Sequence, residues 1–557
     1  QVANGVYGEW HNWGFFDNEP DVSEPMAGAF REWLREKYGT ESALQRAWNN
    51  PLASFESAQP PSMAGRATTG IFRDPSTERA VIDFYTCMHQ VVAGNILHFA
   101  RVLKATWPRP IIAGTFYGYF FSTFGRQAAG GHLQLQRLLE SPDLDYLSGP
   151  QAYEPEAVEL GDPYRSRSLI TSIRLHRKLW LDEMDVEPKI PILKDTDYRR
   201  RLQESVADVR RNTAFSYTKG MGLWYYDFNI SGVDLDGYTH LMSGSQGNWD
   251  HPVVMQQIER MKRIFEERAF NTPYRSEADV LFVYDTDSFY HTASLKNADP
   301  VSSTLIDYLS LAAFRSGVIF DPIHLDDLPR IDLAPYRVVV FGNAFLISEA
   351  ERRFVHEKVA TAGRQLIWFY APGYLHEDSG EAALRHTASL TGFSLKPEVL
   401  DAPPEVRFSP ESAGGMAYSL GDSPIHPLLA IEDPEAEVHA RFTATGDAAI
   451  ARKDFPGHTA WFVSLPPRET EPVRFLLDQC GAHRYGEPDA FFYGGGGVLV
   501  LHSMTGGTRH ITLRDGRSLT LDLPDGPATV LLDSQSGQVL LQEYPQDIDG
   551  VLVKYPN

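Results

Sequence analysis

The first half of the chain alternates short apolar segments with longer amphipathic segments, and this alternation restricts the fold more than any other feature. Each short segment has the length of a strand, and each long one carries apolar residues at helical spacing. Parallel strands need a crossover of about a dozen residues or more, usually a helix, so the pattern predicts parallel βα units. Five such strands are predicted, at residues 5–10, 111–116, 144–149, 179–183 and 222–227.

The predicted helices between these strands have recognisable ends. Asp21 or Ser23 can cap a helix over residues 22–38, and prolines end a helix over residues 77–106. A third long helix is predicted over residues 196–218. A (β/α)8 barrel needs eight strands to close, so we predict a partial TIM barrel that lacks three strands on its N-terminal side.

The pattern changes after about residue 275. Near-continuous apolar strands at residues 278–284, 338–341 and 366–369 are typical of a parallel sheet that is buried on both faces. With a helix over residues 302–315 and a late strand at residues 459–463, they predict a doubly wound α/β domain. The last part alternates short strands with Gly and Asp turns, which predicts a small antiparallel β-sandwich. The predicted domains are residues 1–265, 275–485 and 490–557.

Composition excludes several classes of function. The formal charge of −22 opposes binding to a phosphate backbone, and no basic stripe offsets it, so no nucleic-acid partner is predicted. No apolar run approaches about 20 residues, so no membrane span is predicted. Cys87 and Cys480 are expected to be buried free thiols. The sequence contains no metal-binding histidine pair, dinucleotide-binding glycine motif or Gly-x-Ser-x-Gly elbow. We therefore expect no metal, no cofactor and no serine hydrolase.

Two glutamates, Glu9 and Glu183, end predicted strands, where the catalytic groups of TIM barrels lie. Cleavage of a glycosidic bond uses two carboxylates, one to transfer a proton and one to attack the sugar or activate water. Glu9 has aromatic neighbours in the sequence, which we expect to raise its pKa and suit it to a general acid. Glu183 stands beside Asp182 and Asp185, and we expect a polar network to keep it ionised as the nucleophile.

Other residues near the strand ends are predicted to bind the sugar through flat aromatic faces or hydrogen bonds. They are Trp10, His11, Tyr117, Gln151, Tyr153, Trp224 and Asp227. Packing in the core is the structural alternative for each of them. Glu19 is a competing acid, but it follows the strand and precedes a helix, where a carboxylate is favoured near the N-terminus.

Two segments of the sequence resemble glycoside hydrolase family 42 and its relatives among the (β/α)8 glycosidases. One begins at Glu9 and extends through residues 30–40, and the other is the strand at residues 180–183. In that family the acid/base ends strand four and the nucleophile ends strand seven. The resemblance therefore implies these roles for the two glutamates and makes the five strands numbers four to eight. It also implies a glutamine-amidotransferase-like trimerisation domain in the middle of the chain, and hence a homotrimer.

The sequence departs from the family pattern at four points. Gly8 replaces the asparagine that usually precedes the acid/base, which affects a contact to the sugar 2-hydroxyl. An Asn-Glu pair does occur at Asn18 and Glu19, so a shifted alignment would transfer the role to Glu19; we favour Glu9 because it ends the strand. The cysteines of a zinc cluster are absent. Strands one to three are absent too, from which we expect that the natural N-terminus precedes Gln1 and that this chain alone is inactive.

The resemblance implies a retaining glycoside hydrolase that cleaves terminal β-glycosidic bonds, with β-galactosides as the expected substrates. A β-mannosidase or another exo-β-glycosidase on the same fold is the first alternative. The alternative from another class is a catalytically inactive carbohydrate-binding protein, since a fold does not determine a function. A carbohydrate is the expected partner in each case. A cytoplasmic location is favoured slightly, and a periplasmic or secreted one stays open because a signal would precede Gln1.

Overall fold

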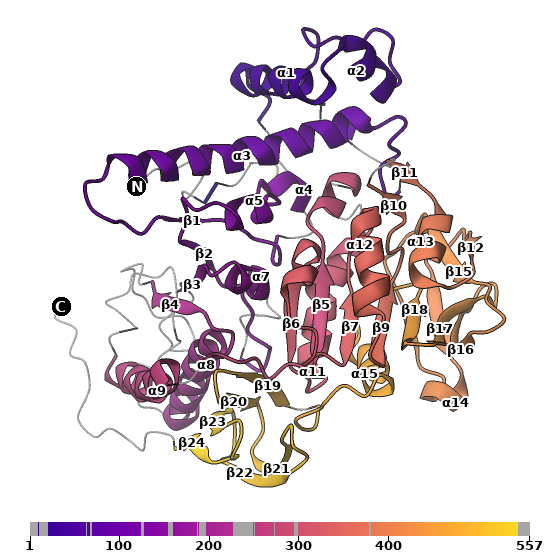
Figure 1. Ribbon diagram of the computed structural model, residues 1–557. Coiled ribbons are helices and arrows are strands. Elements are labelled where there is room, and N and C mark those ends of the chain that lie inside the picture. Colours follow the sequence, from indigo (N-terminus) through magenta and orange to yellow (C-terminus); the bar gives the residue numbers. More distant parts are fainter. Residues whose placement is uncertain are drawn as a thin grey trace.

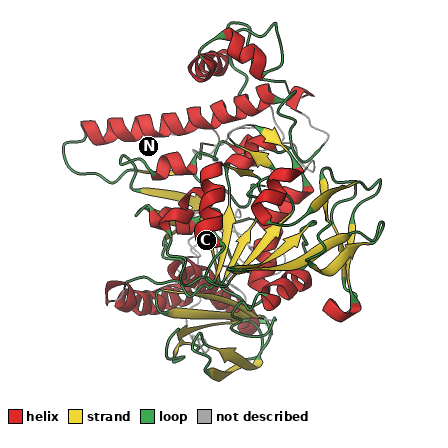
Figure 2. Ribbon diagram, turned by 45° about the vertical axis from the view of Figure 1, so that its right-hand side comes forward, coloured by secondary structure: helices red, strands yellow, loops and turns green. Residues whose placement is uncertain are grey.

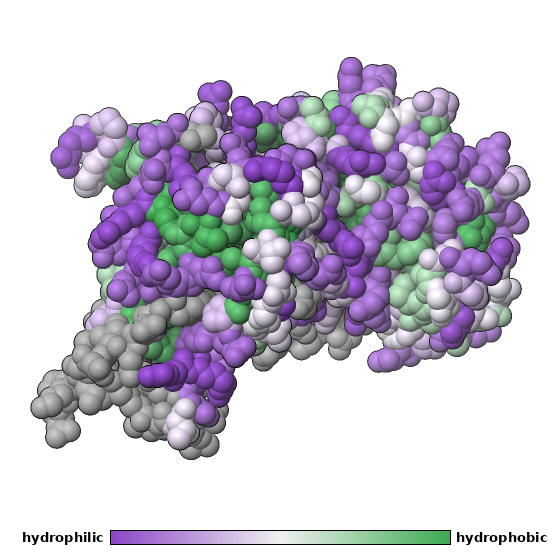
Figure 3. Space-filling view, turned by 90° about the horizontal axis from the view of Figure 1, so that it is seen from below, coloured by the Kyte–Doolittle hydropathy of each residue, from purple (hydrophilic) through white to green (hydrophobic). Residues whose placement is uncertain are grey.

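The computed structural model of the protein describes most of the chain. The described residues are 9–10, 21–62, 64–66, 70–123, 127–153, 160–185, 188, 196–226, 249, 251–271, 273–293, 299–377, 380–488 and 490–543. In this part of the chain, no helix is both long and apolar enough to cross a membrane. Hydrophilic residues dominate the face of the molecule seen in Figure 3, and apolar side chains gather in limited areas of it.

Four parallel strands form the first sheet: β1 Gly114–Phe116, β2 Tyr146–Pro150, β3 Leu179–Met184 and β4 Gly222–Tyr225. Their order is β1-β2-β3-β4, and each neighbouring pair is parallel, so four of the five predicted strands are confirmed. β1 starts three residues later than predicted. The predicted strand at residues 5–10 lies outside the described residues except for Glu9 and Trp10, which are not in a strand. Trp10 has a positive φ of 59°, which no strand residue adopts.

Helices connect these strands and precede the first of them (Figure 1). Their bounds are α1 Glu24–Tyr38, α2 Glu41–Ala47, α3 Arg79–Thr106, α4 Gln127–Gly130, α5 Leu135–Leu139, α7 Ile170–Leu175, α8 Tyr198–Thr218 and α9 Pro252–Asn271. Ser23 caps α1 as predicted, because its side chain accepts a hydrogen bond from the N–H of Met26. The buried face of α1, which includes Phe30 and Leu34, packs toward α3. Helix α9 continues past residue 265, the predicted end of the first domain.

A sheet of eleven strands forms the middle of the molecule. Its parallel core consists of β5 Val280–Tyr284, β6 Phe320–His324, β7 Val338–Phe341, β9 Arg364–Phe369 and β18 His458–Val463. These strands lie in the order β6-β5-β7-β9-β18. This is the order of flavodoxin-like folds, so the predicted doubly wound architecture is confirmed. The helices of this part are α10 Pro300–Ser303, α11 Leu309–Arg315, α12 Glu349–Phe354, α13 Leu384–Thr391, α14 Pro410–Ala413 and α15 Thr470–Gln479.

Six antiparallel strands extend this sheet beyond β18, and the sequence analysis did not predict them. They are β12 Leu395–Glu398, β13 Glu405–Phe408, β14 Ala417–Ser419, β15 Leu428–Ile431, β16 Glu437–Phe442 and β17 Ala448–Phe455. Prolines, glycines and charged residues interrupt the apolar alternation by which strands are recognised, so this region resembles a loop in the sequence. A further small sheet contains β8 Leu346–Ile347, β10 Leu375–His376 and β11 Glu381–Ala382.

The C-terminal part is antiparallel, as predicted. Its sheet has the order β19-β20-β23-β24, and β21 and β22 form a separate hairpin. The strands are β19 Ala490–Gly495, β20 Val498–Ser503, β21 Gly507–Thr512, β22 Ser518–Leu523, β23 Ala528–Asp533 and β24 Val539–Leu541. Helix α8 contacts β19, β20 and β23, and Thr529 Oγ1 donates a hydrogen bond of 2.6 Å to the Ala207 carbonyl. The C-terminal sheet therefore packs against the helix that precedes β4 (Figures 1 and 2).

Both cysteines are buried and free, as the sequence predicted. Burial is the main cause that raises the pKa of the Cys87 thiol to about 12. Burial also raises the pKa of Cys480, which follows helix α15. Both thiols therefore stay protonated at neutral pH, and neither is a reactive nucleophile.

Candidate active site

Strand β3 carries two acidic residues, Asp182 and Glu183, near its carboxyl end, and Asp185 follows it directly. Successive side chains of a strand point to opposite faces, so Asp182 and Glu183 point away from each other. Asp182 is completely buried and accepts hydrogen bonds from Tyr164 Oη at 2.5 Å, Trp180 Nε1 at 3.1 Å and Ser216 Oγ at 3.1 Å. Burial outweighs these donors and raises the pKa of Asp182 to about 6. The polar network expected around Glu183 thus surrounds its neighbour.

The carboxyl group of Glu183 lies in an environment that disfavours its charge. The residue is 8% exposed, and no described residue donates a hydrogen bond to its carboxylate. Burial, followed by the negative charges of Asp185, Glu9 and Asp182, raises the pKa of Glu183 to about 8. The sequence argument assigned the raised pKa to Glu9, and it did not anticipate that burial among acids would raise that of Glu183.

Glu9 is brought to this site by contacts with the loop that follows β1. Tyr119 Oη donates a hydrogen bond of 2.9 Å to Glu9 Oε2, across 110 positions of sequence. His132 Nδ1 accepts from the backbone N–H groups of Gly118 and Tyr119, at 3.2 and 3.3 Å. The proton of this imidazole is therefore on Nε2, which donates to the Glu9 carbonyl at 2.9 Å. His132 holds the backbone of Glu9, and the sequence analysis missed it.

A buried arginine lies between the two tyrosines that contact the acids. The Arg167 guanidinium is 4.6 Å from the ring centre of Tyr119 and 5.1 Å from that of Tyr153. The Tyr153 hydroxyl donates to Asp185 Oδ2, and burial raises the pKa of Asp185 to about 6. The positive charge of Arg167 lowers the pKa of both Asp185 and Tyr119, against the effect of burial. Arg167 lies outside any strand end, so strand position did not identify it.

The predicted sugar-binding residues lie in different environments. Tyr117 is fully buried, donates to the Gly131 carbonyl at 3.0 Å and stacks on His132 at 4.5 Å, which is a packing role. Trp10 is buried and donates from its indole nitrogen to Thr115 Oγ1 at 2.9 Å. His11, Asp227 and the competing acid Glu19 lie outside the described residues.

Three other predicted residues lie beside Glu183. The backbone N–H of Gln151 donates to the Glu183 carbonyl at 3.3 Å, and its buried side-chain amide has no hydrogen-bond partner in the described structure. Trp224 is opposite Glu183 in the register of β3 and β4, and 39% of it is exposed. Tyr153 reaches the site through Asp185. An exposed tryptophan face and an unpaired amide are groups that can contact a sugar.

A cavity of about 610 Å³ lies beside the middle of the parallel strands and is lined by Trp10, Tyr146, Leu181 and Trp224, among others. Neither Glu9 nor Glu183 lines it. In parallel α/β folds the reacting groups lie at the carboxyl ends of the strands, so the carboxylates define the candidate site better than this cavity does. The described residues contain no group of three His, Cys, Asp or Glu side chains placed to hold a metal ion.

A buried ion pair joins this site to the central α/β part. Asp307, in the π-helical turn η6 Thr304–Tyr308, accepts from Arg165 Nη2 at 3.2 Å and from the backbone N–H of Ser122 at 3.1 Å. The Ser122 carbonyl in turn accepts from Arg167 Nη2 at 2.9 Å. The position of Arg167 between the two tyrosines therefore depends on Asp307, which lies in the connection between β5 and β6 of the central sheet.

Replacement of Asp307 by Ala is expected to destabilise the protein. It removes the carboxylate that pairs with the buried Arg165 at 3.2 Å, and removal of one partner of a buried pair costs about 3–5 kcal/mol of unfolding free energy. Urea unfolding followed by fluorescence measures this change. The control is Asp422→Ala, at an exposed position, which is expected to change stability little. A loss at Asp307 no larger than that of the control would contradict the assigned role.

Known proteins are similar to this chain in sequence and in fold. The sequence model of glycoside hydrolase family 42, described as beta-galactosidase, matches residues 10–192, a range that contains β1 to β3 and Glu183. The structure is similar to the beta-galactosidase of Bacillus circulans sp. alkalophilus, with a TM-score of 0.60 and 14% identity over 92% of this chain and 77% of that one. It is also similar to the enzyme of Rahnella sp. R3, with a TM-score of 0.62 and 16% identity over 92% and 76% of the two chains.

A third similar structure is the beta-galactosidase of the haloarchaeon Halorubrum lacusprofundi, with a TM-score of 0.61 and 16% identity over 94% of this chain and 78% of that one. At these identities the likeness establishes a shared α/β fold. The family match over residues 10–192 adds the sequence evidence. Residues 10–192 therefore match glycoside hydrolase family 42, and together with the shared fold these findings support a glycoside hydrolase.

Proposed function

We propose that the protein hydrolyses terminal β-glycosidic bonds with retention of configuration, through Glu183 as nucleophile and Glu9 as acid/base. The observation that carries this proposal is the approach of the two carboxyl groups. Glu9 is one of the charges that raise the pKa of Glu183, although 174 positions separate the two residues. Two carboxylates that converge at the carboxyl end of a parallel strand are the groups that glycoside hydrolysis needs.

The proposed reaction has two displacements. The Glu183 carboxylate attacks the anomeric carbon while the glycosidic C–O bond breaks, and Glu9 transfers its proton to the departing oxygen. A water molecule then gives a proton to Glu9 and attacks the same carbon, which releases Glu183 and the sugar. The site returns to its starting protonation state, with one water molecule consumed. Tyr119 and His132 hold Glu9 in place, by its carboxylate and its backbone respectively.

We propose a β-galactoside as the substrate, because the matching family and the similar structures carry that description. The alternatives are a β-mannoside or another terminal β-glycoside, favoured by Gly8 at the position where the family has asparagine. Release of nitrophenol from β-galactoside, β-mannoside, β-glucoside, β-fucoside and α-arabinopyranoside substrates by the full-length protein distinguishes them. Sugar binding without turnover of any substrate would instead support the carbohydrate-binding alternative.

The alkaline limb of the pH profile is expected near pH 8. The mechanism needs one proton on the carboxyl pair, and the productive form carries it on Glu9. Burial and the neighbouring acids raise the pKa of Glu183 to about 8, so the pair loses its last proton as the pH rises through this value. We therefore expect kcat/KM to decrease above about pH 8, measured between pH 5 and 10 on an aryl glycoside.

Asp185→Asn tests the origin of that limb. Asp185 is the largest electrostatic cause of the raised pKa of Glu183, after burial. The asparagine amide keeps an oxygen that accepts from Tyr153 but removes the charge, so the limb should move to lower pH. An unchanged limb in Asp185→Asn would show that another group controls it.

We propose that the protein forms a homotrimer through its central α/β part, because this part resembles the trimerisation domain of the family. Light scattering at micromolar concentration measures the mass directly. A trimer is expected at about three times the 62.5 kDa of one chain. A mass equal to that of a single chain would contradict the proposal.

A further inference from the structure

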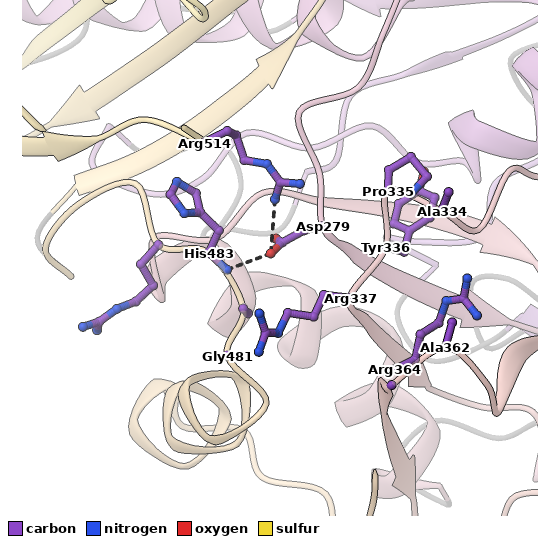
Figure 4. A pocket seen from close by; sticks show the side chains of 13 residues that line it. Asp279, Ala334, Pro335, Tyr336, Arg337, Ala362, Arg364, Gly481, His483 and Arg514 are labelled. Atoms are coloured by element: carbon purple, nitrogen blue, oxygen red, sulfur yellow. Dashed lines mark hydrogen bonds and ion pairs between the residues drawn. The ribbon is translucent and has the colours of Figure 1, made fainter. Parts of the chain in front are cut away.

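A second cavity, of about 940 Å³, lies at the edge of the central sheet where its parallel strands begin. Asp279 directly precedes β5, Arg337 directly precedes β7, and Arg364 is the first residue of β9. The remaining wall comes from the segment after α15, with Arg484, and from the turn between β21 and β22, with Arg514. Figure 4 shows labelled side chains from these separate segments around the cavity. Glu9 and Glu183 do not line it.

The lining carries an excess of positive charge in a protein whose formal charge is −22. Four arginines line the cavity, and Asp279 is its single lining carboxylate. Asp279 Oδ2 already forms an ion pair with Arg514 at 3.2 Å and accepts a hydrogen bond from the backbone N–H of His483 at 2.8 Å. Burial lowers the pKa of His483, which is therefore neutral at pH 7. The net charge of the lining thus comes from the guanidinium groups.

Two of these arginines, Arg337 and Arg364, have no carboxylate within 4 Å among the described residues, whereas Arg484 and Arg514 each have one. Arg337 is exposed, and its Nε donates to the Cys480 carbonyl at 3.3 Å, while its terminal nitrogens contact no described acceptor. Its guanidinium lies directly on the backbone of Gly481, where a Cβ atom would come within 3.0 to 3.1 Å of it. Gly481 also has a φ of +68°, a left-handed conformation that favours glycine there.

Arg364 and Arg484 have different roles in the same wall. The terminal nitrogens of Arg364 donate to backbone carbonyls, including that of Leu333 at 3.1 Å, while its buried Nε has no partner among the described residues. Arg364 therefore joins two of the segments that build the cavity. Arg484 pairs with Asp478 at 3.3 Å, a residue that does not line the cavity. The charge of Arg484 is therefore already paired with a carboxylate outside the cavity lining.

We propose that this cavity binds a small anion that carries phosphate groups, with Arg337 as the main ligand and Arg484 and Arg514 as supporting charges. Arginine is the side chain best suited to phosphate, because its planar fork donates two parallel hydrogen bonds to one group. The cavity volume lies within the range of about 300–1,000 Å³ that is usual for small-molecule sites. Arg337 and Arg364, the two lining arginines without a carboxylate within 4 Å among the described residues, favour an anion that carries more than one negative charge, such as a diphosphate.

Isothermal titration of the full-length protein with pyrophosphate, in a buffer without other multivalent anions, tests this proposal. We expect one site per chain, with binding at least tenfold weaker in Arg337→Gln. Arg337→Lys keeps the charge but loses the two-pronged geometry, so its affinity should lie between those two. Arg484→Gln is a second variant, and its expected loss is smaller because Asp478 already neutralises part of the charge.

The matched control is Arg441→Gln, an exposed arginine on β16 that does not line the cavity. Its affinity for pyrophosphate should equal that of the unchanged protein. Absence of binding, or equal losses in the Arg337 and Arg441 variants, would overturn the proposal, because the charge effect would then be general. Citrate serves as a carboxylate probe of similar charge. Tighter binding of citrate than of pyrophosphate would overturn the assignment to phosphate.

Discussion

Glu183→Gln is expected to reduce glycoside hydrolysis by about 1,000-fold or more, which is the usual scale for loss of a catalytic nucleophile. The amide is nearly the same size as the carboxylate but cannot form the covalent intermediate. No described residue donates a hydrogen bond to the Glu183 carboxylate, so the substitution removes no hydrogen bond within the described part of the chain. The measurement is kcat/KM on the aryl glycoside that the unchanged protein hydrolyses best.

The same variant is expected to be more stable than the unchanged protein at alkaline pH. The pKa of Glu183 is raised from 4.5 to about 8 in the folded state, so the folded protein binds this proton more tightly than the unfolded chain does. The folded state is therefore penalised progressively as the pH rises from about 4.5 to 8. Glutamine never ionises, so the gain should reach a few kcal/mol, on the order of 1.4 per pKa unit, at pH 9 and vanish near pH 4.

The matched control for both effects is Glu398→Gln. Glu398 is also buried and also ends a strand, β12, but it lies in the central sheet and accepts a hydrogen bond from Thr445 at 2.9 Å. This variant should keep its activity and lose a little stability. Full activity in Glu183→Gln would remove Glu183 from the mechanism, whereas lost activity with a stability gain would separate catalysis from folding.

Glu9→Gln is expected to lose activity in a way that depends on the leaving group. General acid catalysis contributes about 10²–10⁴-fold, and a poor leaving group needs it most. Hydrolysis of a disaccharide or an alkyl glycoside should therefore decrease far more than hydrolysis of a dinitrophenyl glycoside, whose phenolate leaves without a proton. The glutamine side-chain oxygen can still accept from Tyr119, so the loop after β1 keeps its contact. Initial rates on a series of aryl glycosides of increasing phenol pKa measure this dependence.

Glu19→Gln distinguishes the two possible acids. Glu19 follows an asparagine, as the acid/base does in the family, so it is the residue that a shifted alignment selects. If Glu9 is the acid, the Glu19 variant should show the same leaving-group dependence as the unchanged protein. A steep dependence in Glu19→Gln together with normal behaviour in Glu9→Gln would transfer the role to Glu19.

Local sequence patterns predicted the parts of the fold that depend on local structure. The alternation of apolar strands and amphipathic helices identified β1 to β4 and the parallel core β5, β7, β9 and β18, because strand and helix periods are properties of short segments. The same periods placed Glu183 near the end of its strand. The strands β12 to β17 were missed because they are stabilised by pairing within a large sheet, and their own patterns are weak.

The sequence by itself determined the order of the strands along the chain, the absence of a dinucleotide-binding motif and the two glutamates worth testing. Only the tertiary structure decided their electrostatics. Burial and three acids raise the pKa of Glu183, and the contact of Tyr119 with Glu9 spans 110 positions. Arg167 and the arginine cavity likewise combine residues from distant segments. Such contacts depend on how elements pack, and desolvation depends on everything around a group, so no short segment of sequence encodes them.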